Sequence, residues 1–347
     1  MATIRDVARE AGVSIATISR LFNGSARVSD DTSKRVREVA ERMGYWPNGA
    51  ARSLITKRTH ALGVLLPDLY GEFFSEVIRG IDLEARREGY HLVVSSSHSD
   101  AGELFAALQT MRGRIDGLIA MAPDLESPGP LEESATRFPT VLVNPGFESE
   151  RCACVAADNA SGARDMVRHL AELGHREIAF IAGPESNRDA LLRLQGFRAG
   201  RRELGLEPSA DLEVRGKFTE SSGYEAARLL LARVPRPTAI FAANDCMAVG
   251  ALSALREAGL RVPVDMAVAG FDDIASSSYL SPGLTTVRVE ASRLGQRAVQ
   301  LLLAAMQGLH SGPPAHEILP ASLVVRESSG AIPGWGRRSS DAAAIRA

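Results

Sequence analysis

The sequence predicts an α/β protein with a small N-terminal three-helix domain and a larger two-lobed domain built on parallel sheets. The chain begins with two short helical runs joined by a tight turn. Further on, apolar β-rich runs alternate with amphipathic helical runs, and this alternation restarts near Asn159. Strand–helix alternation is typical of parallel sheets covered by helices, and its restart indicates two similar lobes.

The composition is that of a globular protein. The 347 residues, 45% hydrophobic and 24% charged, are enough for two or three cores. No stretch approaches the roughly 18 apolar residues that span a membrane, and no basic-then-apolar leader opens the chain. Cys152, Cys154 and Cys246 lack metal-ligand spacing. We expect a cytoplasmic protein with no membrane contact, cofactor or metal, and buried thiols at Cys152 and Cys154.

Charge is distributed unevenly along the chain. Residues 1–60 hold 11 Lys/Arg and 6 Asp/Glu, a balance of +5, whereas the rest holds 29 and 36, a balance of −7. A basic head suits a nucleic-acid partner, although charge alone is equally compatible with a solvated helical bundle.

The first helices form a helix-turn-helix pattern. Apolar residues at helical spacing after Thr3 predict a helix over 4–11, Gly12 permits a positive φ at the stop, and Ser14 can cap a second helix over 15–21. A third apolar run predicts a helix over 32–43 that closes the core.

The second helix has the features of a recognition helix. Ile18 and Leu21 point inward, which leaves the remaining side chains on other faces: Ile15, Ala16, Thr17, Ser19 and Arg20. Its short N-terminal side chains let the backbone approach a major groove, and Arg20 can make paired hydrogen bonds to a guanine edge.

The segment "YWPNGAARSLITKRT" follows this domain. Pro47 favours a first helical turn, but Gly49 costs on the order of 1 kcal/mol in so short a helix, which should therefore need a partner to fold. Alternatively, the segment is a flexible linker.

In the body, polar residues follow several predicted strands: Asp68, Asn144, Asn244, Asp245 and Asp272. Ligands of open α/β sheets bind at the carboxyl ends of strands, so these residues indicate a site between the lobes. Each of them could instead cap the helix that follows its strand.

The stretch "TIRDVAREAGVSIATISRLFNG", followed by "VSDDTSKRVREVAERMGYWPNGAARSL", resembles the N-terminal domain of the lactose/galactose repressor (LacI) family of bacterial transcription regulators. The resemblance continues to about residue 328. It implies a DNA-binding domain over 1–46, a hinge helix and linker over 47–59, and a periplasmic-binding-protein-like effector and dimerisation domain over 60–329. The two lobes would comprise 60–158 with 290–318 and 159–289 with 319–329, and a disordered tail would follow over 330–347.

The resemblance also implies which residues contact an operator. They are Thr3, Ser14, Ile15, Ala16, Thr17, Ser19, Arg20, Asn23, Arg52, Leu54 and Ile55. In the family the hinge helix orders on DNA and a residue at the position of Leu54 wedges into a central minor-groove step. Ile55 can donate no hydrogen bond, so hinge recognition should be driven by DNA shape.

For the effector the resemblance implies a set of contacts between the lobes. They are Phe73, Phe74, Asn144, Asn187, Asp189, Arg193, Phe218, Asn244 and Asp272. Asn, Asp and Arg side chains suit the dense hydrogen bonding of a polyol, and Phe rings suit the C–H face of a sugar. Purine-responsive members carry arginine and threonine at the positions of Asn187 and Asp189, which argues for a carbohydrate here.

These observations predict a repressor that binds a palindromic operator as a homodimer and is released by a small carbohydrate. The tail lacks the leucine heptads that would make a tetramer. One alternative is a regulator that needs a corepressor, either a purine-like ligand or a partner protein. A sugar-binding transport protein is a further alternative, but it would lack the DNA-binding head. We expect no enzyme, because the sequence has no GxSxG, HExxH, P-loop or Rossmann motif.

Overall fold

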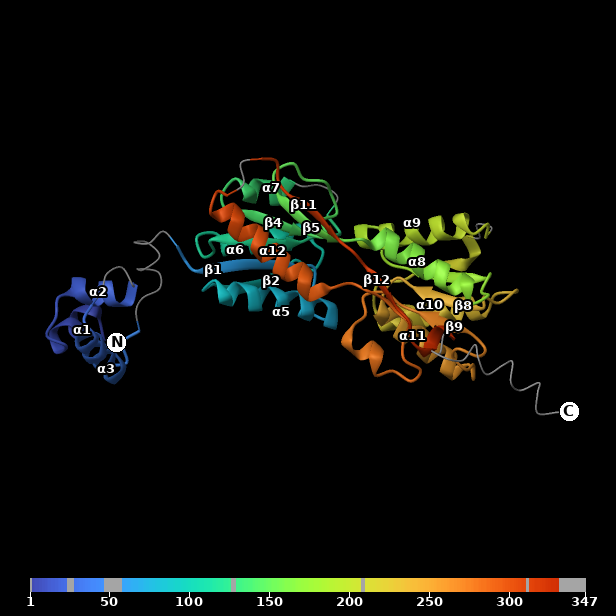
Figure 1. Cartoon of the computed structure of the whole chain (residues 1–347), viewed down its shortest axis with the longest axis horizontal. Coiled ribbons are helices and arrows are strands. Elements are labelled where there is room, and N and C mark those ends of the chain that lie inside the picture. Colours follow the sequence, from blue (N-terminus) through green and yellow to red (C-terminus); the bar gives the residue numbers. More distant parts are fainter. Residues whose placement is uncertain are drawn as a thin grey trace. The chain divides into compact units, whose positions relative to one another are not determined.

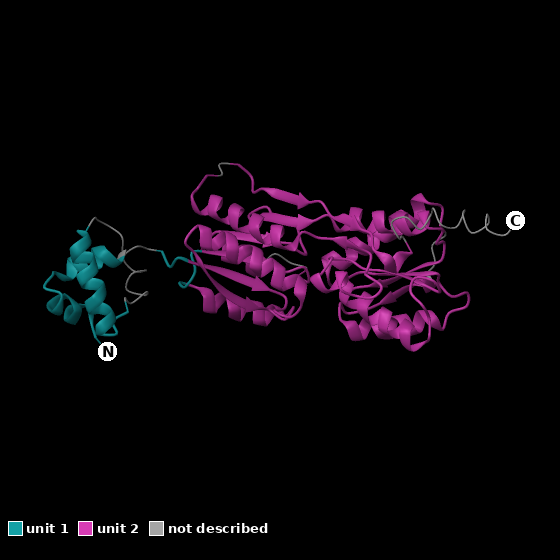
Figure 2. Ribbon diagram, turned by 60° about the horizontal axis from the view of Figure 1, so that its bottom comes forward, with its two compact units in different colours: residues 1–60, 113–116 teal, residues 61–112, 117–347 magenta. Residues whose placement is uncertain are grey.

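The computed structural model describes residues 2–23, 28–46, 58–125, 129–206, 210–309 and 312–330. The chain divides into two compact units, Met1–His60 with Gly113–Asp116 and Ala61–Arg112 with Gly117–Ala347 (Figure 2). The predicted hinge helix and linker over 47–59 lie outside the described residues except for residues 58 and 59, and the predicted tail over 330–347 lies outside them except for Gly330. No helix in the described ranges is long and apolar enough to cross a membrane.

The first unit contains the three predicted helices, which begin and end within two residues of the predicted bounds. They are α1 (Ile4–Glu10), α2 (Ile15–Asn23) and α3 (Asp30–Arg42). Thr3 and Asp6 form a reciprocal capping box at the start of α1. Gly12 has a φ of +64°, and the Ser14 hydroxyl accepts a hydrogen bond from the Thr17 amide at 3.1 Å. Local sequence signals therefore set the helix-turn-helix geometry.

A small hydrophobic core holds these helices together. Val7, Ile18 and Val36, one from each helix, are completely buried, and Leu21 packs against them from α2. Because Ile18 and Leu21 face this core, the opposite side of α2 is left for other contacts.

The second unit begins with a six-stranded parallel sheet, here called the N-lobe sheet (Figure 1). Its spatial order is β11 (His316–Leu319), β5 (Ala153–Ala157), β4 (Thr140–Val143), β3 (Gly117–Met121), β1 (Ala61–Leu66) and β2 (His91–Ser96). Four helices accompany it: α5 (Glu72–Arg87), α6 (Ala101–Met111), α7 (Gly129–Ala135) and α12 (Ala291–Met306). Helices α5 and α12 lie side by side along the sheet.

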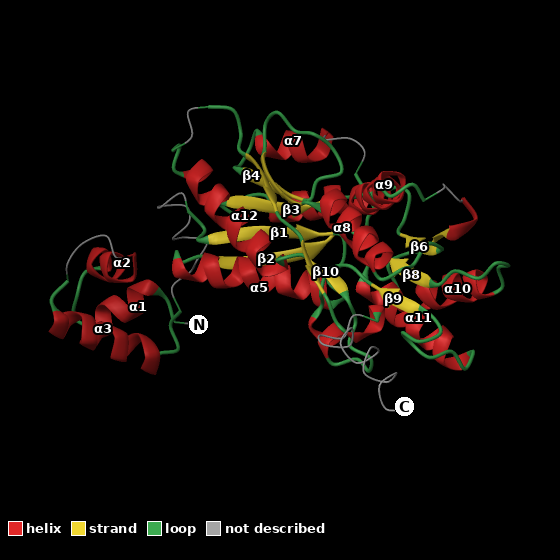
Figure 3. Cartoon of the chain, turned by 45° about the vertical axis from the view of Figure 1, so that its right-hand side comes forward, coloured by secondary structure: helices red, strands yellow, loops and turns green. Residues whose placement is uncertain are grey.

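A four-stranded parallel sheet forms the C-lobe, which Figure 3 shows beside the larger sheet. Its order is β7 (Glu213–Arg215), β6 (Ile178–Ala182), β8 (Ala239–Ala242) and β9 (Ala267–Ala269). Helices α8 (Asn159–Glu172) and α9 (Arg188–Glu203) pack as one pair, and α10 (Glu220–Leu231) and α11 (Asp245–Glu257) as another. A separate antiparallel pair joins β10 (Thr286–Arg288) to β12 (Ser322–Val324).

The chain passes between the two lobes from β5 to α8, from β10 to α12 and from β11 to β12. The predicted boundaries 158/159 and 289/290 lie between these elements, whereas the predicted boundary 318/319 lies inside β11. The α/β class predicted from strand–helix alternation is confirmed, since every neighbouring pair in both sheets is parallel.

Candidate functional site

The predicted DNA-reading side chains of the head are grouped on and before α2. Ile15 is 45% exposed, and Ala16 and Arg20 are also exposed, whereas Thr17 and Ser19 are half-buried. Ser14 and Thr3 are exposed at the helix starts that they cap. Arg52, Leu54, Ile55 and the side chain of Asn23 lie outside what the structure describes.

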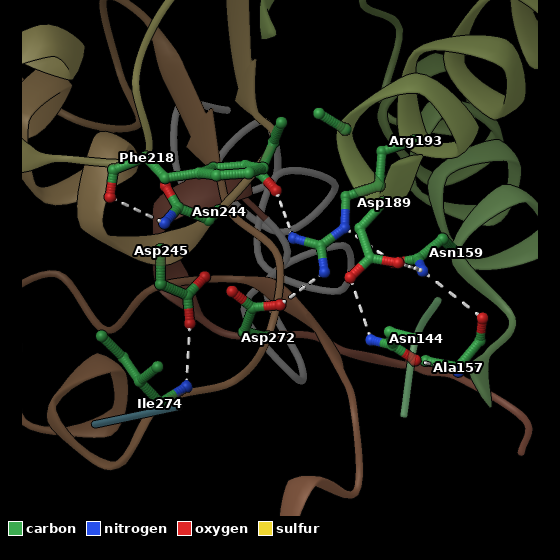
Figure 4. A network of polar contacts seen from close by, with 12 residues as sticks. Asn144, Ala157, Asn159, Asp189, Arg193, Phe218, Asn244, Asp245, Asp272 and Ile274 are labelled. Carbon is green, nitrogen blue, oxygen red and sulfur yellow. Dashed lines mark hydrogen bonds and ion pairs between the residues drawn. The ribbon is translucent and has the colours of Figure 1, made fainter. Parts of the chain in front are cut away.

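In the second unit, four of the predicted effector residues gather around a fifth, Arg193, whose guanidinium is buried (Figure 4): Asn144, Asp189, Phe218 and Asp272. Arg193, on α9, is only 4% exposed. Its Nε donates to Asn159 Oδ1 at 2.7 Å, and its NH1 donates to the carbonyl of Ala243 at 2.6 Å. Its NH2 forms an ion pair of 2.9 Å with Asp272, which follows β9. The guanidinium therefore joins three segments of the C-lobe.

A second carboxylate in this group connects the lobes. Asp189 lies one turn before Arg193 and accepts a hydrogen bond at 2.9 Å from each of two amides, those of Asn159 and Asn144. Asn144 follows β4 of the N-lobe sheet, and its oxygen accepts the amide of Ala157 at 3.0 Å. We call Asn144, Asn159, Asp189, Arg193 and Asp272 the Arg193 cluster.

The electrostatics of the cluster are unbalanced, because buried carboxylates outnumber the cation. Burial raises the pKa of Asp189 and that of Asp272, the latter to about 6, while Arg193 opposes both shifts. Nearby, burial and the charge of Asp272 raise the pKa of Asp245 to about 7. Arg193 therefore acts on two buried carboxylates, and a third lies near Asp272.

Two of the predicted effector residues act as helix caps in this structure. Asn187 accepts the Ala190 amide at the start of α9 at 3.1 Å, and its amide group donates to Asp124 of the N-lobe at 2.9 Å. Asn244 accepts the Met247 amide at the start of α11 at 2.9 Å. The capping interpretation of strand-end residues is correct for these two asparagines, which makes any ligand contact an additional role.

The aromatic residues are arranged in two places. The Phe218 ring lies 5.9 Å from the Arg193 guanidinium, and the Phe218 carbonyl accepts the side-chain amide of Asn244. Phe73 and Phe74 lie at the start of α5, edge to face with 5.6 Å between ring centroids, and are half-buried against the core.

Sequence reasoning missed three residues at this site. Asn159 links Arg193 to Asp189, and the Phe271 ring lies 4.0 Å from the Arg193 guanidinium. Asp245 was named among the polar strand-end residues that indicate a site, but not among the effector contacts. The available signal was position, since each of the three directly follows a strand or the turn after one.

No group of His, Cys, Asp and Glu side chains among the described residues is arranged to hold a metal ion. Cys152 and Cys154 are free and buried, and burial raises the pKa of both thiols. A cavity of about 450 Å³ near Ser278–Gly283 contains none of the predicted effector residues.

Comparisons with known proteins agree with both parts of this architecture. Residues 3–48 match the family described as bacterial regulatory proteins, lacI family, and residues 167–329 match the periplasmic binding protein-like domain. The chain is 35% identical over 333 residues to the HTH-type transcriptional repressor CytR of Escherichia coli (strain K12), an alignment that covers 96% of this chain and 97% of that protein.

Solved structures show the same relationship. The lac repressor dimer bound to operator and the anti-inducer ONPF has a TM-score of 0.85 and 33% identity, covering 95% of this chain and 99% of that one. The complex of the transcriptional regulator CelR with cellobiose has a TM-score of 0.73 and 32% identity, covering 94% and 100%. The helix-turn-helix head, the two parallel-sheet lobes and these similarities together establish that the chain belongs to the LacI family of bacterial regulatory proteins.

Proposed function

We propose that this regulator represses transcription by binding a palindromic operator as a homodimer, and that an uncharged polyol, most simply a small sugar, releases it. The exposed face of α2 supplies base contacts through Ile15, Ala16 and Arg20. Two copies of a basic head on a two-fold axis match two half-sites of a palindrome. The similar lac repressor was solved as a dimer on its operator, which supports this arrangement.

The Arg193 cluster is the observation that carries the effector assignment. Its carboxylates accept hydrogen bonds from hydroxyl groups, and the N–H groups that Arg193 does not use can donate to them. The Phe218 ring offers an apolar face beside these groups, as sugar sites require. The similar regulator CelR was solved with cellobiose, a sugar.

The charge of the cluster restricts the effector further. Burial raises the pKa of Asp189, Asp272 and Asp245, so this interior disfavours negative charge and would also disfavour an anionic ligand. We therefore infer that the effector carries no phosphate or carboxylate group.

Fluorescence anisotropy of a labelled operator, titrated with matched pairs of effectors, tests this function. The pairs are D-ribose with D-ribose 5-phosphate and D-glucose with D-glucose 6-phosphate, and cellobiose is an unpaired member. We expect an uncharged member to release the operator and its phosphate ester to fail at 100-fold higher concentration. A phosphate ester that acts at equal or lower concentration contradicts the assignment of an uncharged effector.

The same titration separates release from corepression. A ligand that tightens operator binding would support the corepressor alternative, in which a purine-like molecule or a partner protein favours the DNA-bound state. Adenosine is included in the panel for this reason.

A further inference from the structure

Asp245 is a completely buried carboxylate that the proposed effector contacts do not use. It is the first residue of α11 and directly follows the capping residue Asn244. The N-terminus of a helix favours a negative charge, but no cationic side chain is hydrogen bonded to this carboxylate in the described structure. A buried acid in such a position requires an explanation.

Three partners of Asp245 lie in residues 271–277, which follow β9, and the fourth, Thr286, begins β10. Oδ2 accepts the Ile274 amide at 3.0 Å and the Ser277 hydroxyl at 2.7 Å. Oδ1 accepts the Thr286 hydroxyl at 2.6 Å, and the Asp245 amide donates to the Phe271 carbonyl at 2.8 Å. One residue therefore holds residues 271–277 at several points.

The backbone beneath this carboxylate has no room for a side chain. A Cβ atom at Gly270 would lie 2.1 Å from Asp245 Oδ1, a distance that no real contact allows. The carboxylate therefore packs directly on the start of the segment that it holds.

This segment carries two of the groups that contact Arg193. The Phe271 ring lies against the guanidinium, and Asp272 forms the ion pair with it. Asp272 has a φ of +105°, a conformation that residues other than glycine rarely adopt. Such strain persists only where the surrounding structure imposes it. Here the Asp272 amide donates to the Val287 carbonyl and the Asp272 carbonyl accepts the Val289 amide, while the hydrogen bonds of Asp245 hold the residues on both sides of Asp272.

We propose that Asp245 is a positioning residue of the effector site, which holds Phe271 and Asp272 against Arg193 by accepting hydrogen bonds from residues 274, 277 and 286. The role in effector binding rests on the proposed function, whereas the restraint of the segment does not. Hydrogen bonding, not charge, performs this role. In Asp245→Asn the amide oxygen can still accept from Ile274 and Ser277, while the new NH₂ group can donate to the Thr286 hydroxyl, which also accepts.

Amide hydrogen exchange of the full chain without ligand tests the restraint. We expect peptides covering 271–277 to exchange at least tenfold faster in Asp245→Ala than in the wild type, and within threefold of the wild type in Asp245→Asn. Ser277→Ala removes one donor from the other side of the contact and should accelerate exchange in the same direction, so the test survives if Asp245→Ala does not fold. Asp265→Asn, an exposed acid of the same lobe, is the matched control and should leave this segment unchanged.

Calorimetric titration with D-ribose, D-glucose and cellobiose tests the link to the effector. For the sugar that binds the wild type, Asp245→Ala should weaken binding at least tenfold and Asp245→Asn should restore it to within threefold. Equal exchange of 271–277 in the wild type, Asp245→Ala and Ser277→Ala would overturn the proposal, as would Asp245→Asn weakening the sugar as much as Asp245→Ala. If no sugar binds the wild type, the proposed function fails while the exchange measurements still decide the role of Asp245.

Discussion

At the residue scale, the effector site depends on how one buried charge is compensated. Arg193 is stable in the interior because a carboxylate, an amide oxygen and a backbone carbonyl accept its N–H groups. A buried ion pair adds little net stability compared with apolar side chains of similar size. Removing one partner is strongly destabilising, however, because the remaining charges stay buried without compensation. The proposed sugar site and the folded core therefore use the same side chains.

Removing Arg193 should consequently destabilise the body as well as the site. We expect Arg193→Ala to lower the free energy of unfolding by about 3–5 kcal/mol, because Asp189 and Asp272 lose their buried cation. Urea denaturation without ligand measures this loss. Arg198→Ala is the control, since Arg198 pairs with Glu213 at the surface and such exposed pairs contribute about 0–1 kcal/mol. An equal decrease in the free energy of unfolding for both variants would show that Arg193 does not neutralise buried carboxylates as described.

The buried carboxylate of Asp245 predicts a pH dependence of stability. Its pKa is raised to about 7 in the folded protein from an ordinary value of 3.8, so the folded state binds the proton more tightly than the unfolded state. The contribution of this proton to folding stability is fully present below pH 3.8 and is lost as the pH rises through 7. The charge of the neighbouring Asp272 contributes to the raised pKa of Asp245. The pKa of Asp272 is in turn lowered by Arg193 and raised by Asp189.

We therefore expect the melting temperature of the wild type to fall more between pH 5 and pH 8 than that of Asp245→Asn, which has no such proton. Thermal unfolding followed by circular dichroism at several pH values checks this. Asp265→Asn should behave like the wild type, because the hydrogen bonds from Arg261 lower the pKa of Asp265 to about 2, below the tested range. Parallel pH profiles for the wild type and Asp245→Asn would refute the shifted pKa.

At the element scale, helix N-termini organise both functional regions. Helix α2 begins at Ile15 directly after its capping residue Ser14, with short side chains that permit close approach to a groove. In the C-lobe, α9 and α11 begin after Asn187 and Asn244, so both caps sit at the carboxyl ends of parallel strands. An asparagine at such a place stabilises its helix whether or not a ligand is present.

The recognition helix leads to a specific prediction about base reading. Arg20→Ala should cost about 1–3 kcal/mol of operator binding and relax the preference mainly at one guanine in each half-site, because a bidentate contact to one base edge is lost. Binding to a library of single-base operator variants measures this. Arg9→Ala, which removes an exposed arginine of α1 paired with Asp6, should leave the base preferences unchanged. A uniform loss across all operator positions would instead make Arg20 a phosphate contact.

At the scale of the whole molecule, the basic head and the acidic body divide the functions. The first 60 residues carry a balance of +5 and the remainder −7. Positive charge on the part that meets DNA favours phosphate contacts, while the acidic remainder disfavours non-specific contact with the duplex. The acidic body is therefore compatible with the proposed uncharged effector and does not attract nucleic acid.

This division predicts a steep salt dependence. If a dimer makes 6–10 phosphate contacts, the affinity for a full palindrome should fall by about 10³–10⁵ between 50 and 200 mM salt, because bound counterions are released on association. Anisotropy titrations at four salt concentrations give the slope. A single half-site should bind far more weakly and with a shallower slope. Equal affinity for half-site and palindrome, or no salt slope, would contradict the dimeric repressor.

Sequence alone determined the local structure and the fold class. The capping hydroxyl of Thr3, the positive φ of Gly12 and the spacing of Val7 and Ile18 are properties of neighbouring residues, and they specified the helix-turn-helix. Likewise, alternating strand and helix runs were sufficient for parallel sheets, because parallel strands require such crossovers.

Only the tertiary structure decided what the polar strand-end residues do. Capping and ligand binding use the same types of side chain at similar positions. Spacing therefore cannot distinguish Asn187, which caps a helix, from Asp189, which is linked to Arg193 through the side chain of Asn159. The partners of Arg193 come from residues 159, 243 and 272, and their convergence depends on how α8, α9 and the C-lobe sheet pack. Burial is likewise a property of the packed core, and it is burial that makes Asp245 and Asp272 unusual acids.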